Sequence, residues 1–204
     1  MKTLLFLLTA LLSVALGGVA RAGGNALPDQ TREVPAGARV SLEADRTEWF
    51  LGENIVVHFK VENVGATPFN VSSGGDYRGG TRSNRFVISA RDAAGHLVPD
   101  PDPVQRITGG MAGDQTLAPG QTWYETLSLL PFCRFEAPGD YDVSASHDLG
   151  WQATPAHPLP IATLKIRLKM PSPKEARTIV EALEKMPPNP GVLMGTKNTK
   201  GLSQ

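Results

Sequence analysis

Hydrophobic and polar residues alternate most regularly over residues 55–62, which read Ile-Val-Val-His-Phe-Lys-Val-Glu. The odd-numbered positions, from Ile55 to Val61, are all apolar, while the even-numbered positions carry Val56 and three polar side chains. A period of two in a segment rich in β-branched residues predicts a half-buried β-strand. Because such a strand has one dry face, it must bury that face against a second layer.

The same period recurs along the chain, at 39–44, 85–92, 122–130, 141–147 and 161–170, with short extended pieces at 68–71 and 96–98. Segment 122–130 is apolar on both sides, which indicates a central strand. Residues 99–118 show no period and predict a long loop, a feature that is usually functional or mobile. The pattern as a whole predicts an all-β fold, an antiparallel β-sandwich of about seven strands over residues 38–170.

The period changes to that of a helix only near the C-terminus. Ser172, Pro173 and Glu175 have the spacing of a capping box with proline at the first helical position. Apolar residues then recur at helical spacing up to the prolines at 187 and 188. We therefore expect one amphipathic helix within 171–187. Its apolar face is expected to dock on the strands, and the alternative is the first face of a helical partner or repeat.

The two ends differ from this middle. Residues 1–22 combine a basic start, an apolar run and Ala-Arg-Ala, which is the layout of a secretory signal peptide, although a membrane anchor is the alternative. We expect export to the periplasm or the extracellular space, with no membrane span after cleavage. Residues 23–37 predict a flexible lead-in, and residues 188–204 predict a disordered tail.

Charge and cysteine content narrow the function classes. The 204 residues hold 20 basic and 20 acidic side chains, and removal of Lys2 and Arg21 with the signal peptide leaves 18 against 20. That balance gives no electrostatic footprint for nucleic acid. Cys133 is the single cysteine, so no internal disulfide can form, and we expect it to be a small buried hydrophobic residue.

No motif predicts an enzyme, a metal or a cofactor. Ser146, His147 and Asp148 are triad residue types, but neighbours on a strand point to opposite faces, and a Gly-x-Ser-x-Gly turn is missing. The four histidines lack metal-ligand spacing, and the glycine-rich loops lack the Lys-Ser/Thr ending of a phosphate cradle. The acidic pair Asp100 and Asp102, with Asp76 or Asp114 brought near, could offer oxygen ligands to Ca²⁺ or could form a solvated turn.

A glycine-, serine- and threonine-rich segment, 72–85, is the best candidate for recognition. It carries Tyr77, Arg78, Arg82 and Arg85, a composition seen in binding loops. If Trp151 or segment 99–118 lies at the same end of the domain, an aromatic and arginine patch results. The alternative is that Tyr77 and Trp151 close the ends of the core.

Several turns resemble those of immunoglobulin-like folds. Residues 139–143, Gly-Asp-Tyr-Asp-Val, resemble the entry to a late strand in which a tyrosine hydroxyl bonds back across the corner. With segments 50–65, 74–79, 132–134 and 147–151, the chain is similar to the immunoglobulin-like module that precedes HEAT-type repeats in exported bacterial proteins. It departs from that pattern because only one helix follows the strands.

The resemblance implies an immunoglobulin-like sandwich and brings no family reaction with it. We therefore expect a non-catalytic binding or adaptor module of the bacterial cell envelope that recognises a protein or glycan through its loops. The alternative is a secreted protease inhibitor on an immunoglobulin-like scaffold that presents a loop such as 99–118. The ligand and the oligomeric state stay open.

Overall fold

The computed structural model describes residues 32–76, 78–79, 82–104 and 108–185. The predicted signal peptide 1–22, most of the lead-in, the tail 188–204 and Tyr77 lie outside the described residues. Within the described part, the chain is built almost entirely from strands and ends in one helix, which confirms the all-β prediction.

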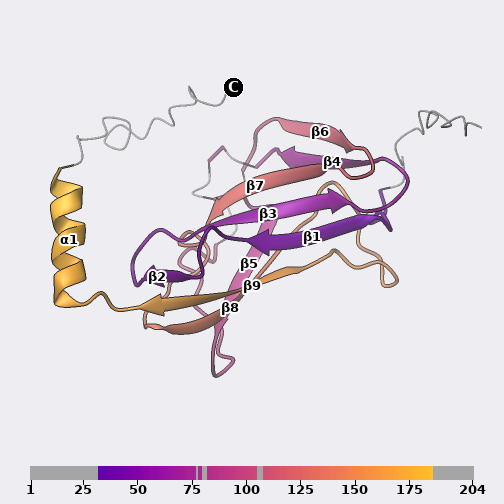
Figure 1. The fold of residues 1–204 in the computed structure, drawn as a ribbon. Coiled ribbons are helices and arrows are strands. Elements are labelled where there is room, and N and C mark those ends of the chain that lie inside the picture. The colour runs from indigo at the N-terminus through magenta and orange to yellow at the C-terminus, as the bar shows by residue number, and fades with distance from the viewer. Residues whose placement is uncertain (1–31, 77, 80–81, 105–107, 186–204) are drawn as a thin grey trace, which may run out of the picture.

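The described residues form nine strands and one helix (Figure 1). They are β1 (Ala38–Glu43), β2 (Glu48–Phe50), β3 (Val56–Asn63), β4 (Phe69–Gly74), β5 (Phe86–Asp92), β6 (Ala112–Leu117), β7 (Thr122–Ser128), β8 (Gly139–His147), β9 (Ala162–Lys169) and α1 (Pro173–Glu184).

These strands form three sheets. One has the order β1-β3-β7, a second has the order β2-β9-β8-β5, and β4 pairs with β6 alone. The first two sheets face each other across the core, where the rings of Phe59 on β3 and Phe86 on β5 meet edge to face at 5.4 Å. Along β3 every second residue, beginning with Val57, is buried, as the alternation predicts.

Two strands were not expected from the sequence. β2 is only three residues long and pairs in parallel with β9, so the chain crosses from one layer to the other after β1. β6 lies within 99–118, which was predicted to be a loop, and its partner β4 supplies the hydrogen bonds that its glycine-containing sequence does not signal. Segment 96–98 forms an isolated bridge between Leu97 and Arg91.

The prediction of a central strand at 122–130 was wrong. Among the described strands, β7 pairs only with β3 and forms the edge of its sheet, and Tyr124 on the outer face is 55% exposed. The apolar content of that face reflects Tyr124 packing against Lys60, whose ammonium lies 5.9 Å from the ring centroid, and not burial under another layer.

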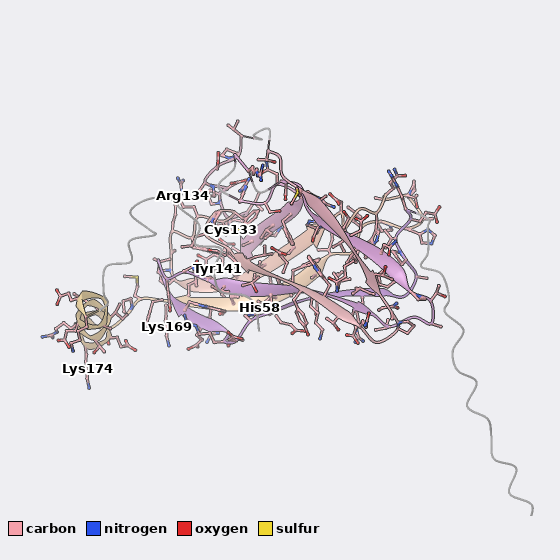
Figure 2. All side chains as sticks on the ribbon, turned by 90° about the horizontal axis from the view of Figure 1, so that it is seen from above. His58, Cys133, Arg134, Tyr141, Lys169 and Lys174 are labelled. Atoms are coloured by element: carbon pink, nitrogen blue, oxygen red, sulfur yellow. The ribbon has the colours of Figure 1, made fainter. Side chains whose placement is uncertain are left out.

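The helix begins with the predicted capping box: the Ser172 N–H donates to Glu175, and the Glu175 N–H donates to the Ser172 hydroxyl. It stands beyond the end of β9 and apart from the sheets (Figure 1, Figure 2), and Lys174 in its first turn is exposed. Ile179 and Val180 are exposed, so docking of this face on the strands is not seen; the two layers already close over each other without it. No helix in the described part of the chain is long and apolar enough to cross a membrane.

Candidate functional site

The β4–β6 ribbon, which comprises residues 69–74 and 112–117, brings the predicted recognition residues together. β4 follows β3 and β6 precedes β7, so the ribbon extends the β3–β7 pair. Asn63 joins the two parts: its buried amide donates to the carbonyls of Thr67 and Leu117, and its oxygen accepts the Gly65 N–H. The ribbon therefore projects from a fixed base.

The edge of β4 that faces away from β6 is closed by side chains. In an antiparallel pair, alternate residues direct their backbone groups outward. On β4 the outward carbonyls are those of Asn70, Ser72 and Gly74, and each accepts a hydrogen bond: from the Trp151 indole N–H at 2.9 Å, and from Arg85 at 3.0 and 2.9 Å. The Ser72 N–H donates to the Leu149 carbonyl. This edge is sealed although no strand lies there.

Arg85 is the centre of the seal. Besides the two carbonyls of β4, its guanidinium binds both carboxylate oxygens of Asp148, at 3.1 Å from Nε. Burial works to raise the pKa of Asp148, but Arg85 and the Gly150 N–H hold that pKa below its usual value. The hydrogen bonds to Asp148 in turn raise the pKa of Arg85. Because the Arg85 guanidinium donates both to Asp148 and to two carbonyls of β4, it acts as a clamp that joins β4 to the end of β8.

The turn after β8 has a backbone shape that completes the seal. Leu149 has a φ of 52° and Gly150 a φ of 79°, both in the left-handed region. A Cβ on Gly150 would lie 2.9 Å from the Cβ of Ser72, so only glycine allows this close approach. The turn carries Trp151 onto Phe69, with the two rings edge to face at 5.8 Å. Trp151 is thus a buried residue that closes the core.

The residues of the triad-like run have separate surroundings. His147 lies in the core against Phe86, and its Nδ1 accepts the Leu149 N–H at 2.8 Å. Burial, helped by Arg85, lowers the pKa of His147 to about 4. Asp148 points the other way, to Arg85. Cys133 is fully buried, as expected, and burial raises the pKa of its thiol to about 12.

Arg82 forms a second clamp, on segment 99–104. It binds both oxygens of Asp100, at 2.7 and 2.8 Å, and the carbonyls of Asp102 and Pro131, and its guanidinium lies over the Phe132 ring. Asp76 is held elsewhere, by the Ser83 hydroxyl and the Arg85 N–H. The carboxylates considered for calcium are therefore not gathered, and the part of the chain that the structure describes holds no group of three or more possible metal ligands.

Of the predicted recognition residues that the structure describes, only Arg78, at the end of the ribbon, is exposed to solvent. The backbones of Arg78 and Gly109 exchange hydrogen bonds of 2.8 and 3.1 Å, and the Gly75 N–H donates to the Met111 carbonyl. Arg78 is exposed, and Met111 is 76% exposed. Of the five predicted recognition residues, Arg82, Arg85 and Trp151 thus make internal contacts, Arg78 lies at this exposed end, and Tyr77 is outside the described residues.

Sequence reasoning missed Glu125. It lies on the inner side of the edge strand β7, opposite Phe59, between Trp123 and Leu127. Burial and the nearby Asp76 carboxylate raise the pKa of Glu125 above its usual value. The sequence did contain a signal for this position: in the alternating pattern of the strand, Glu125 falls on the same face as the apolar residues Trp123 and Leu127.

Comparison with family models and with curated proteins finds no match to this chain. Among solved structures, a β-glucosidase from Erythrobacter marinus is similar, at 14% identity over 65% of this chain and 15% of its own length, with a TM-score of 0.34. A β-glucosidase from Listeria innocua shares 11% identity over 64% of this chain and 16% of its own, with a TM-score of 0.33. The chain spans a small part of each enzyme, and likenesses this weak carry no argument about function.

Proposed function

We propose that this chain is an exported, non-catalytic binding module of the cell envelope with an immunoglobulin-like sandwich fold. Two features support the fold. A three-stranded sheet faces a four-stranded sheet in which β2 runs parallel to β9. The Tyr141 hydroxyl at the start of β8 donates to the Ala137 carbonyl four residues upstream at 2.7 Å, the geometry of a tyrosine corner.

A binding role is supported by one observation: two arginine clamps hold the segment that carries Tyr77 and Arg78. Arg82 binds Asp100, and Arg85 binds Asp148 together with the carbonyls of Ser72 and Gly74, which precede Arg78 in the chain. Binding residues are most effective when a rigid scaffold positions exposed loops, because less conformational freedom is lost on association. The exposed end of the ribbon is therefore the proposed recognition surface for a protein or glycan partner.

The test is a comparison of surface and clamp variants of the mature chain. Arg78→Ala combined with Met111→Ala is expected to reduce capture of one defined envelope protein, or binding to one defined glycan on an array, with an unchanged Tm. Arg85→Ala is expected to lower the Tm and binding together. Full binding by the Arg78/Met111 variant would contradict this surface.

A second candidate, a secreted protease inhibitor, is favoured by the extended and exposed conformation of β6 within 99–118. Substrate-like inhibitors present such a segment to the protease. Inhibition of a panel of secreted proteases, lost on Met111→Glu, would support this candidate, and resistance of the proteases to the unmodified chain would exclude it.

A further inference from the structure

The outer edge of β7 is open. Hydrogen bonds from the Asn63 N–H to the Gln121 carbonyl and from the Leu129 N–H to the Ile55 carbonyl fix the register with β3. In this register the odd-numbered residues of β7 bond to β3, so the even-numbered residues 122–128 direct N–H and C=O groups to the other side. Among the residues described here, none makes a backbone hydrogen bond to those groups.

Three other strands among the described residues have outer edges that are covered at least in part. β4 is closed by Arg85 and its neighbours, the end of β9 by β2, and the end of β5 by the Val98 N–H, which donates to the Ala90 carbonyl. β7 reads Thr-Trp-Tyr-Glu-Thr-Leu-Ser and contains neither proline nor lysine. An edge without proline or lysine, whose one charged residue (Glu125) points inward, can pair with a strand that neutralises that charge.

Charge indicates what kind of strand can pair there. From Ala112 to Ser128 the chain has two acidic side chains, Asp114 and Glu125, and no basic one. Glu125 faces between the layers and lies near a second carboxylate, that of Asp76. In a strand added antiparallel to β7, the residue opposite Glu125 would face the same side, with Cβ atoms about 5 Å apart. A lysine or arginine at that position would offset both carboxylates.

The length of the edge argues against a second copy of this chain as the occupant. Seven residues span about 23 Å, which matches a peptide segment, whereas a stable dimer needs about 1,600 Å² of buried surface. A second β7 would also bring another Glu125 and no cation. The edge is complementary to an extended segment of a different protein.

We infer that the open edge of β7 binds an extended polypeptide segment of a partner protein, which adds a fourth strand to the β1-β3-β7 sheet and places a basic side chain opposite Glu125. This inference rests on the proposed binding function and specifies its partner. Backbone hydrogen bonds supply the affinity in such β-augmentation, and the side chain facing Glu125 supplies the selectivity.

The probes are capped seven-residue peptides of alternating valine and threonine with lysine at the centre. Matched controls carry glutamate at the centre, or N-methyl groups on alternate amides. Fluorescence anisotropy is expected to show the lysine peptide binding about tenfold more tightly than either control. Amide NMR signals of Tyr124 and Thr126 are expected to shift on binding.

Three variants separate the contributions. Thr126→Pro, which removes an outward N–H, is expected to abolish binding with the fold retained. Glu125→Gln is expected to erase the preference for lysine over glutamate, whereas Glu62→Gln on the outer face of β3 keeps it. No binding of the lysine peptide at about 1 mM, equal binding of the N-methylated peptide, or unchanged binding by Thr126→Pro would overturn the inference.

The same set distinguishes the inference from the proposed function. Arg78→Ala is expected to leave peptide binding intact. One outcome would support the proposed function alone: the Arg78/Met111 variant loses the envelope partner, the β7 edge variants keep it, and no peptide binds. In that case the binding module is supported and the β7 site is contradicted. If every variant binds as the unmodified chain does, both proposals fail.

Discussion

β4 and β7 have outer edges of similar length in neighbouring parts of the structure. The two edges differ in whether their outward backbone groups have hydrogen-bond partners. On β4, one guanidinium and one indole donate to the three outward carbonyls, and one turn carbonyl accepts the Ser72 N–H. On β7 the outward groups of residues 122–128 have no such partner within the described residues. The comparison shows that backbone groups at the edge of a sheet can find partners in side chains and turns when no further strand lies there.

The largest expected effect comes from breaking the seal at its centre. Arg85→Ala would leave Asp148 with the Gly150 N–H as its remaining donor and the carbonyls of Ser72 and Gly74 without a donor. We expect a loss of about 3–4 kcal/mol in the free energy of unfolding, near the lower end for a broken buried pair because Asp148 is 41% exposed. Urea unfolding measures this loss.

The control for that substitution is Arg167→Ala, which breaks the exposed ion pair with Asp140 on the outer face of β9. We expect little change there, because water replaces an exposed partner. Equal losses from the two substitutions would show that the Arg85 clamp does not hold the ribbon.

The second-largest expected effect is a dependence of stability on pH that comes from His147, which lies beside the sealed edge of β4. Its pKa is lowered from 6.5 to about 4 in the folded state. Between these two pH values, His147 is therefore protonated in the unfolded chain and neutral in the folded chain. Stability is therefore complete above about pH 6.5 and falls by about 3 kcal/mol as the pH drops to about 4.

Carboxylates contribute mainly below about pH 5, so the slope between pH 6.5 and 5 reports on His147. His147→Asn keeps an acceptor for the Leu149 N–H. This variant is expected to be less stable overall, but its stability should not change between pH 6.5 and pH 5. Thermal unfolding at several pH values provides the measurement, and a slope retained in His147→Asn would assign the dependence to another group.

Proline substitution tests the two edges as a matched pair. Ser72→Pro removes the N–H that donates to Leu149 on the sealed edge, and is expected to cost about 2–3 kcal/mol. Thr126→Pro removes an N–H that no described residue accepts, and is expected to cost less than about 1 kcal/mol because proline suits an outward edge position. Chemical denaturation of both variants decides whether β7 is as open as the hydrogen bonds indicate.

The smallest effect is expected at Glu125. Because burial and Asp76 raise its pKa, the ionised form is disfavoured in the folded state, and Glu125→Gln should raise the Tm at pH 7 by about 1–3 °C. The gain should shrink as the pH falls through the raised pKa, where glutamate becomes neutral. Glu62, whose pKa is lowered by Arg39, gives the control, and its replacement by glutamine should not raise the Tm.

Much of the fold could be predicted from the sequence, but little of the candidate site could. Alternation located the strand at Val57 and its neighbours, because burial of one face is a local property of the chain. It could not find β6, whose glycine and polar residues become a strand only through pairing with β4. Composition grouped Arg82 and Arg85 as recognition residues, yet composition carries no information about which carboxylate each will meet.

The sequence by itself determined the layered β-structure, the capped helix after Ser172 and the buried state of Cys133, since period, capping spacing and apolar character act over a few residues. Tertiary structure alone decided that the outer edge of β7 stays without backbone partners among the described residues, whereas the outer edge of β4 is covered by side chains and a turn. The physical reason is that edge and interior depend on partners distant in the sequence: Asp148 and Trp151 follow β4 in the chain only after four further strands.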